Sequence, residues 1–121
     1  MGFVGDFILM NELRATKIAF ANLPPYSQQI ALREFRQLTS KSESCDSKET
    51  LSARVFEAAL RRQELGHTAN AIPEWVGACL AESHLLMRQK AWSSNSKWQS
   101  KLAEVEAWIE QATSGVPKTD G

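Results

Sequence analysis

Apolar residues recur at steps of three and four along nearly the whole chain, which is the spacing of an amphipathic α-helix. The most regular run follows steps of 4, 3, 4 and 3 near the end of the sequence: Trp98, Leu102, Val105, Ile109 and Ala112. We find no convincing alternation of apolar and polar residues, which a half-buried strand would show. The periodicity therefore predicts an all-α fold, a compact bundle of about five helices that forms a single domain.

Helix-breaking and helix-capping residues set the first two predicted helices. Asp6 is expected to cap the first helix, which runs to about Asn22, and Pro24 and Pro25 then stop it. Ser27 is expected to cap a second helix over residues 28–39. Because the turn between them is short, the two helices are expected to pack as an antiparallel pair.

The third and fourth helices are expected over residues 51–65 and 73–91. Ser47 or Thr50 is the expected cap of the third helix, and Gly66 is the residue expected to end it in the left-handed conformation. Pro73 is expected in the first turn of the fourth helix, because its missing N–H costs nothing there. A serine-rich break at 93–96 precedes the last helix, which ends near Thr113.

Two segments lack the helical pattern. Residues 39–50 contain four serines and alternating charges, and Cys45 is their one apolar residue, so this segment is expected to be a flexible loop. Residues 114–121 are expected to be a disordered tail. The predicted helical domain therefore comprises residues 1–113.

The balance of positive and negative charges limits which classes of function fit the chain. The 121 residues carry 14 Lys and Arg and 14 Asp and Glu, so the formal net charge is zero, and no segment is strongly basic. A non-specific nucleic-acid binder usually carries a basic surface, which this composition does not indicate. Zero net charge also leaves little to oppose self-association, so a homodimer is one expectation.

The remaining composition predicts neither a cofactor nor a metal. Two cysteines, Cys45 and Cys79, form no metal-ligand spacing, and His84 has no second ligand at helical spacing. Unpaired cysteines fit a reducing cytosol. The apolar start of the chain lacks the positive region of a secretory signal, and no stretch approaches the roughly 20 apolar residues of a membrane span. We therefore expect a cytoplasmic protein with no membrane partner.

Four tryptophans are candidate partner-binding residues: Trp75, Trp92, Trp98 and Trp108. Tryptophan is enriched at binding hot spots because its large ring buries much apolar area. The alternative is that these rings fill gaps between helices. The regular stripe from Trp98 to Ala112 also has two interpretations. It could form a partner or homodimer seam, or it could face the core, because both kinds of helix show this spacing.

One short motif has catalytic content, an arginine followed five positions later by a histidine in Arg62–His67. It resembles the R-x4-H signature of HEPN ribonucleases, which are small all-α domains. The resemblance covers these six residues and implies metal-independent RNA cleavage at a composite dimer site. There His67 would move a proton and Arg62 would stabilise charge on the phosphate. Alternatively, Arg62 is a solvated helix residue and His67 a loop residue near a helix end.

A further alternative is a helical nucleic-acid-binding protein. Folding would then have to gather arginines that are dispersed in the sequence: Arg33, Arg36, Arg54, Arg61 and Arg62. The leading expectation is a small non-enzymatic protein-binding module. It would act as an accessory subunit, regulator or inhibitor of a larger protein or ribonucleoprotein complex.

Overall fold

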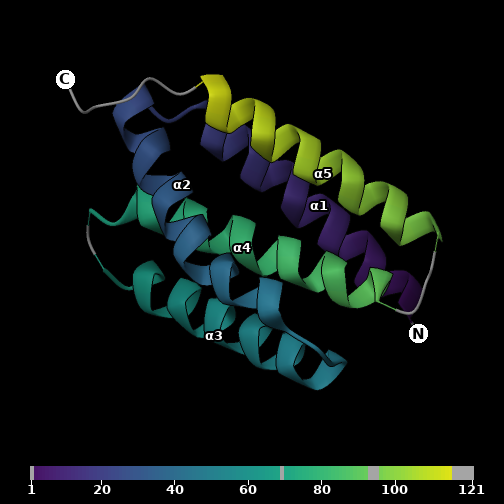
Figure 1. Cartoon of the computed structure of the whole chain (residues 1–121). Helices are drawn as coiled ribbons and strands as arrows, with labels where there is room; N and C mark the ends of the chain where they lie inside the picture. Colours follow the sequence, from purple (N-terminus) through teal and green to yellow (C-terminus); the bar gives the residue numbers. More distant parts are fainter. Residues whose placement is uncertain (1, 69, 93–95, 116–121) are drawn as a thin grey trace.

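The computed structural model describes residues 2–68, 70–92 and 96–115, which form a bundle of helices (Figure 1). Its elements are α1 (Gly2–Ala21), α2 (Pro25–Thr39), the 3-10 helix η1 (Ser40–Ser44), α3 (Lys48–Gly66), α4 (Ile72–Ala91) and α5 (Ser96–Gly115). This described part of the chain contains no strand. The all-α bundle of five helices predicted from the periodicity is confirmed.

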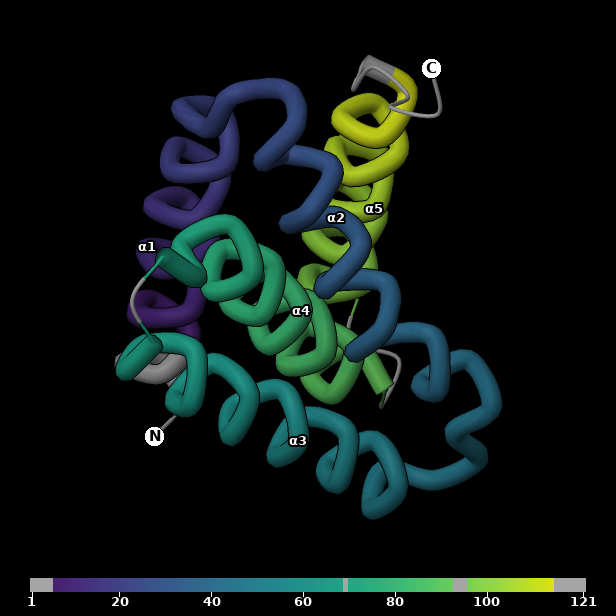
Figure 2. Tube along the Cα trace, turned by 90° about the vertical axis from the view of Figure 1, so that its left-hand side faces the viewer, coloured from purple at the N-terminus to yellow at the C-terminus, as the bar shows by residue number. Residues whose placement is uncertain are grey.

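Helix α4 is the centre of the bundle, and each of the other four α-helices packs against it. Figure 2 shows α1, α2, α3 and α5 arranged around it. The buried residues of α4 therefore lie on several sides of the helix: Val76, Gly77, Ala78, Leu80, Ala81, Ser83, His84, Leu85, Met87 and Ala91. α1 and α2 contact each other sparsely and pack mainly on α4, so their antiparallel pairing is not the main packing unit that the short turn predicted.

The stripes expected to face the core do so. Many of their large members are 6% exposed or less: Leu9, Leu13, Phe20, Leu32, Phe35, Leu51, Val76, Leu80, Met87, Trp98 and Val105. Four other large members are half-buried: Leu38, Leu86, Leu102 and Ile109. The amphipathic spacing thus identified most of the core correctly. Among the described residues, no helix combines the length and apolar character that a membrane span needs.

Gly77 marks a very close approach of α2 and α4. A Cβ atom at this position would lie 2.2 Å from the carbonyl oxygen of Ala31 and 3.0 Å from Cβ of Glu34. Only glycine, which lacks a Cβ atom, allows two helix backbones to come this close without displacement. The contact fixes the point at which α2 crosses α4.

Two helices begin earlier than predicted. α1 begins at Gly2, so Asp6 lies inside the helix and is not its N-cap. α2 begins at Pro25 after the N-cap residue Pro24, so Ser27 is not the cap. Proline fits the first helical turn because its φ is already helical and its missing N–H has no partner to lose. This preference outweighed the capping tendency of the serine.

The boundaries of α3 and α4 follow the prediction in part. Ser47 caps α3, and its hydroxyl accepts from the Thr50 amide while Thr50 accepts from the Ser47 amide. Pro73 lies in the first turn of α4 as predicted. The prediction for Gly66 is wrong, because α3 continues through it and no described glycine has a positive φ. Asn70, with φ 67°, supplies the left-handed residue instead.

The segment expected to be a flexible loop is partly helical. Within it, Ser42 is buried in η1, donates to the carbonyl of Thr39 at 2.5 Å and accepts from Nη1 of Arg88 at 2.5 Å. These bonds tie η1 to α2 and α4, so this part is not a solvated loop. At the other end, α5 continues to Gly115. Residues 116–121 of the expected tail and residues 93–95 of the expected break lie outside the described residues.

Candidate functional site

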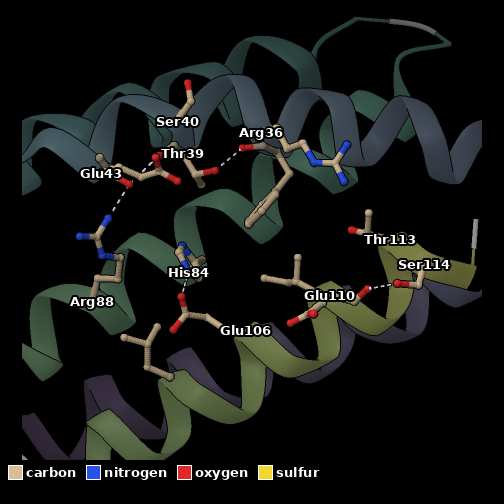
Figure 3. A pocket seen from close by; sticks show the side chains of 14 residues that line it. Arg36, Thr39, Ser40, Glu43, His84, Arg88, Glu106, Glu110, Thr113 and Ser114 are labelled. Atoms are coloured by element: carbon tan, nitrogen blue, oxygen red, sulfur yellow. Dashed lines mark hydrogen bonds and ion pairs between the residues drawn. The ribbon is translucent and has the colours of Figure 1, made fainter.

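A groove lies between α2 with η1 on one side and α5 on the other, with α4 as its floor (Figure 3). Its volume is about 930 Å³. We call it the α2–α5 groove, and it is lined by Phe35, Arg36, Thr39, Ser40, Ser42, Glu43, His84, Arg88, Leu102, Glu106, Ile109, Glu110, Thr113 and Ser114. Helical spacing places these residues together, since the α5 members recur at steps of three and four and His84 and Arg88 are one turn apart.

The floor and the rims of the groove differ in chemistry. The deep part is mixed, because Phe35 is buried and Leu102 and Ile109 are half-buried, while polar side chains are buried beside them: Thr39, Ser42 and His84. The exposed rims are charged. Arg36 lies on the α2 side and Glu110 on the α5 side, as Figure 3 shows.

His84 is a neutral imidazole at pH 7, although it lies near both an arginine and a glutamate. The residue is 8% exposed, and its ring packs edge-on against Phe35, with ring centroids 5.6 Å apart. Burial, together with the positive charge of Arg88, lowers the pKa of His84 from 6.5 to about 4. Its Nε2 atom lies 3.8 Å from Oε2 of Glu106. Because the neutral imidazole carries no positive charge, this contact is not a salt bridge. Its Nδ1 atom is buried without a hydrogen-bond partner.

The four candidate tryptophans differ in burial. Trp98 is 4% exposed and belongs to the core, so its assignment as a partner contact is wrong. Trp108 is half-buried and packs edge-on against Phe20, with centroids 5.5 Å apart. Trp75 and Trp92 are exposed, but their 17-residue separation along α4 places them about 25 Å apart. Each is therefore a separate feature of the surface.

The stripe that begins at Trp98 packs mainly on the bundle, because Trp98 and Val105 are buried, while Leu102 and Ile109 are half-buried and line the α2–α5 groove. Exposed large apolar side chains occur instead on α1, where Phe7, Ile8 and Ile18 are each at least half exposed. The homodimer itself stays a prediction.

Arg62 and His67 do not converge within this chain. Nε of Arg62 lies 2.8 Å from Oε1 of Glu82 on α4, in an ion pair whose N–H is not aligned for a hydrogen bond. His67 is the exposed residue that follows the last residue of α3. His67 lies beyond the helix, and even within a helix side chains five positions apart point about 140° away from each other, which accounts for the separation. Within one chain, the positions of Arg62 and His67 therefore do not support the ribonuclease site that the HEPN resemblance implies.

The five candidate nucleic-acid-binding arginines are mostly engaged with carboxylates. Three form ion pairs: Arg54 with Glu57, Arg61 with Glu34 and Arg62 with Glu82. The other two, Arg33 and Arg36, are exposed on α2. Pairing neutralises the charge that phosphate contacts would need, so the fold does not strengthen the nucleic-acid alternative.

The pair between Arg61 and Glu34 has a structural role that can be tested. Nε and Nη2 of Arg61 donate to the two carboxylate oxygens of Glu34 at 3.0 and 3.2 Å, and the Glu34 side chain is 7% exposed. Replacing Arg61 by methionine should destabilise the protein by about 2 kcal/mol, because a buried carboxylate loses its partner. The same change at Arg54, whose partner is about half exposed, should cost less than about 0.5 kcal/mol. Urea unfolding of both variants measures the difference, and equal costs would contradict the structural role.

A second, smaller cavity of about 210 Å³ lies between α1, α3 and α4 and contains Cys79. Burial raises the pKa of the Cys79 thiol to about 12, so this cysteine is a thiol and not a reactive thiolate at neutral pH. Cys45 is half-buried, whereas the polar sequence around it indicated exposure, and both cysteines are free.

Within the described ranges, no group of three or more His, Cys, Asp and Glu residues could hold a metal ion. The chain was also compared with known proteins. No protein-family model, no curated protein and no solved structure matches it.

Proposed function

We propose that this chain is a non-enzymatic protein-binding module that holds a segment of a larger protein in the α2–α5 groove. The observation that carries the proposal is the groove itself, with its volume of about 930 Å³, the apolar side chains of Phe35, Leu102 and Ile109 in its deep part, and charged rims. Interfaces between proteins commonly combine a buried apolar centre with a polar rim. In this role the chain would act as an accessory subunit, regulator or inhibitor, and two unpaired cysteines support a cytoplasmic setting.

The chemistry of the groove favours binding over catalysis. A general acid or base must reach a proton on the substrate directly or through one water. Nδ1 of His84 is shielded from solvent, and Nε2 faces Glu106 at 3.8 Å, beyond hydrogen-bond distance. Ser42 is buried and its hydroxyl is bonded to Thr39 and Arg88, so it is poorly placed as a nucleophile.

Photocrosslinking tests where a partner binds. p-Benzoylphenylalanine would replace Ser40 or Ser114 at the rims of the groove, and Phe56 on the exposed side of α3 as the control. In a native lysate we expect both rim positions to crosslink to the same protein and the α3 position not to crosslink to it. Nuclease treatment should leave these crosslinks intact. Crosslinks from Phe56 alone would contradict the proposal, and crosslinks lost on nuclease treatment would favour the nucleic-acid alternative.

Matched charge reversals then test the groove with the purified partner. Arg36→Glu should weaken binding about tenfold, because the charge at the rim is reversed, whereas Arg33→Glu should change it less than about twofold. Both arginines are exposed on α2, but only Arg36 lines the groove. Isothermal titration calorimetry measures both affinities, and an equal loss in the two variants would exclude the groove as the binding site.

A further inference from the structure

The α2–α5 groove has the length of a short helix. α2 and α5 both pack on α4, but they are not among the helix pairs that contact each other closely. On the α5 side the lining residues run from Leu102 to Ser114, which corresponds to a length of about 18 Å. About three turns of a further helix fit this length, and such a helix would pack on α4 beside both neighbours.

The α5 side of the groove is acidic, whereas the α2 and η1 side carries Arg36 toward one end and the carboxylate of Glu43 toward the other (Figure 3). Glu106 and Glu110 are one turn apart on α5, and both are exposed. Because His84 is neutral, it does not compensate the charge of Glu106. Arg36 lies across the groove on α2, toward the same end as Glu110 (Figure 3). The remaining cation, Arg88, already donates to Ser42.

From this charge pattern we infer that the occupant is an amphipathic helix of a partner protein, with Lys or Arg on the flank that faces α5 and an acidic residue toward Arg36. Its apolar stripe would pack on Phe35, Leu102 and Ile109. The inference rests on the proposed function and specifies the partner's secondary structure and charges. Opposite charges across such an interface provide specificity by disfavouring helices with the reverse pattern.

The test is selection from a displayed library of amphipathic helical peptides of about four turns, with flank positions varied among Lys, Glu and Gln. The whole chain is the target, together with two variants. The double variant Glu106→Lys/Glu110→Lys reverses the charge of the α5 rim. The control is Glu104→Lys, an exposed α5 residue that does not line the groove.

We expect the wild type and the Glu104→Lys control to select Lys on one flank, and the double variant to select Glu there. A selected Lys peptide should bind the double variant at least about tenfold more weakly, with the loss diminished at high salt. The inference would be overturned if the wild type and the double variant selected the same flank residues, or if neither selected a helical peptide. If a natural partner crosslinks from the groove through an extended or uncharged segment, the inference fails while the proposed function stands.

Discussion

Replacing Gly77 by alanine is expected to destabilise the protein by about 3 kcal/mol. The new Cβ atom would lie 2.2 Å from the carbonyl oxygen of Ala31, well inside van der Waals contact. The obstructing atom belongs to the backbone, so no side-chain rotation relieves the contact and α2 must move away from α4. The loss exceeds the gain of about 1 kcal/mol in helix propensity that alanine normally brings.

Gly66→Ala is the matched control. A Cβ atom at Gly66 would lie 3.7 Å from Nε1 of Trp75, which is ordinary contact, so this variant should be neutral or slightly more stable. Chemical denaturation followed by circular dichroism compares the two variants with the wild type. Equal stabilities of the Gly77 and Gly66 variants would show that the close approach of α2 and α4 is not required.

Stability should fall by about 3 kcal/mol between pH 6.5 and pH 4 because of His84. Burial and the charge of Arg88 lower the pKa of this histidine to about 4 in the folded protein. In the unfolded chain its pKa returns to about 6.5, so between these values the unfolded state binds a proton that the folded state does not. The contribution is therefore complete above pH 6.5 and is lost as the pH falls toward 4.

A His84→Leu variant isolates this contribution. Urea unfolding across the pH range should show a smaller loss on acidification for the variant than for the wild type. Burial also raises the pKa of Glu82, which acts in the opposite direction in acid, but it does so in both proteins and cancels in the comparison. Parallel pH profiles would mean that His84 titrates normally in the folded state.

The fold was predictable where helices have one buried side. In α1 and α5 the spacing alone identified core residues such as Leu13 and Val105. It failed for the central helix, because Ala78, Ala81 and Leu85 are fully buried although they do not share the expected spacing. The stripe expected for α4 consists of Val76, Cys79, Leu80, Ser83, Leu86 and Met87. A helix that is packed on several sides has no single apolar face for periodicity to detect.

The candidate site was not predictable in the same way. Phe35, His84 and Ile109 come from three helices, and no local spacing relates them. The sequence singled out Trp98 because tryptophan is common at interfaces, but residue type does not determine burial. Burial of His84 depends on how α2 crosses α4, which in turn depends on the absence of a Cβ atom at Gly77.

The central position of α4 also has a consequence for local fluctuations. Since the four other α-helices pack on it, the peptide groups in its middle reach solvent only when the whole bundle opens. Deuterium uptake there reports global unfolding, whereas uptake at exposed helix ends such as His67 reports fraying. The slowest-exchanging amides of the chain are therefore expected in the segment around Leu80 to Met87.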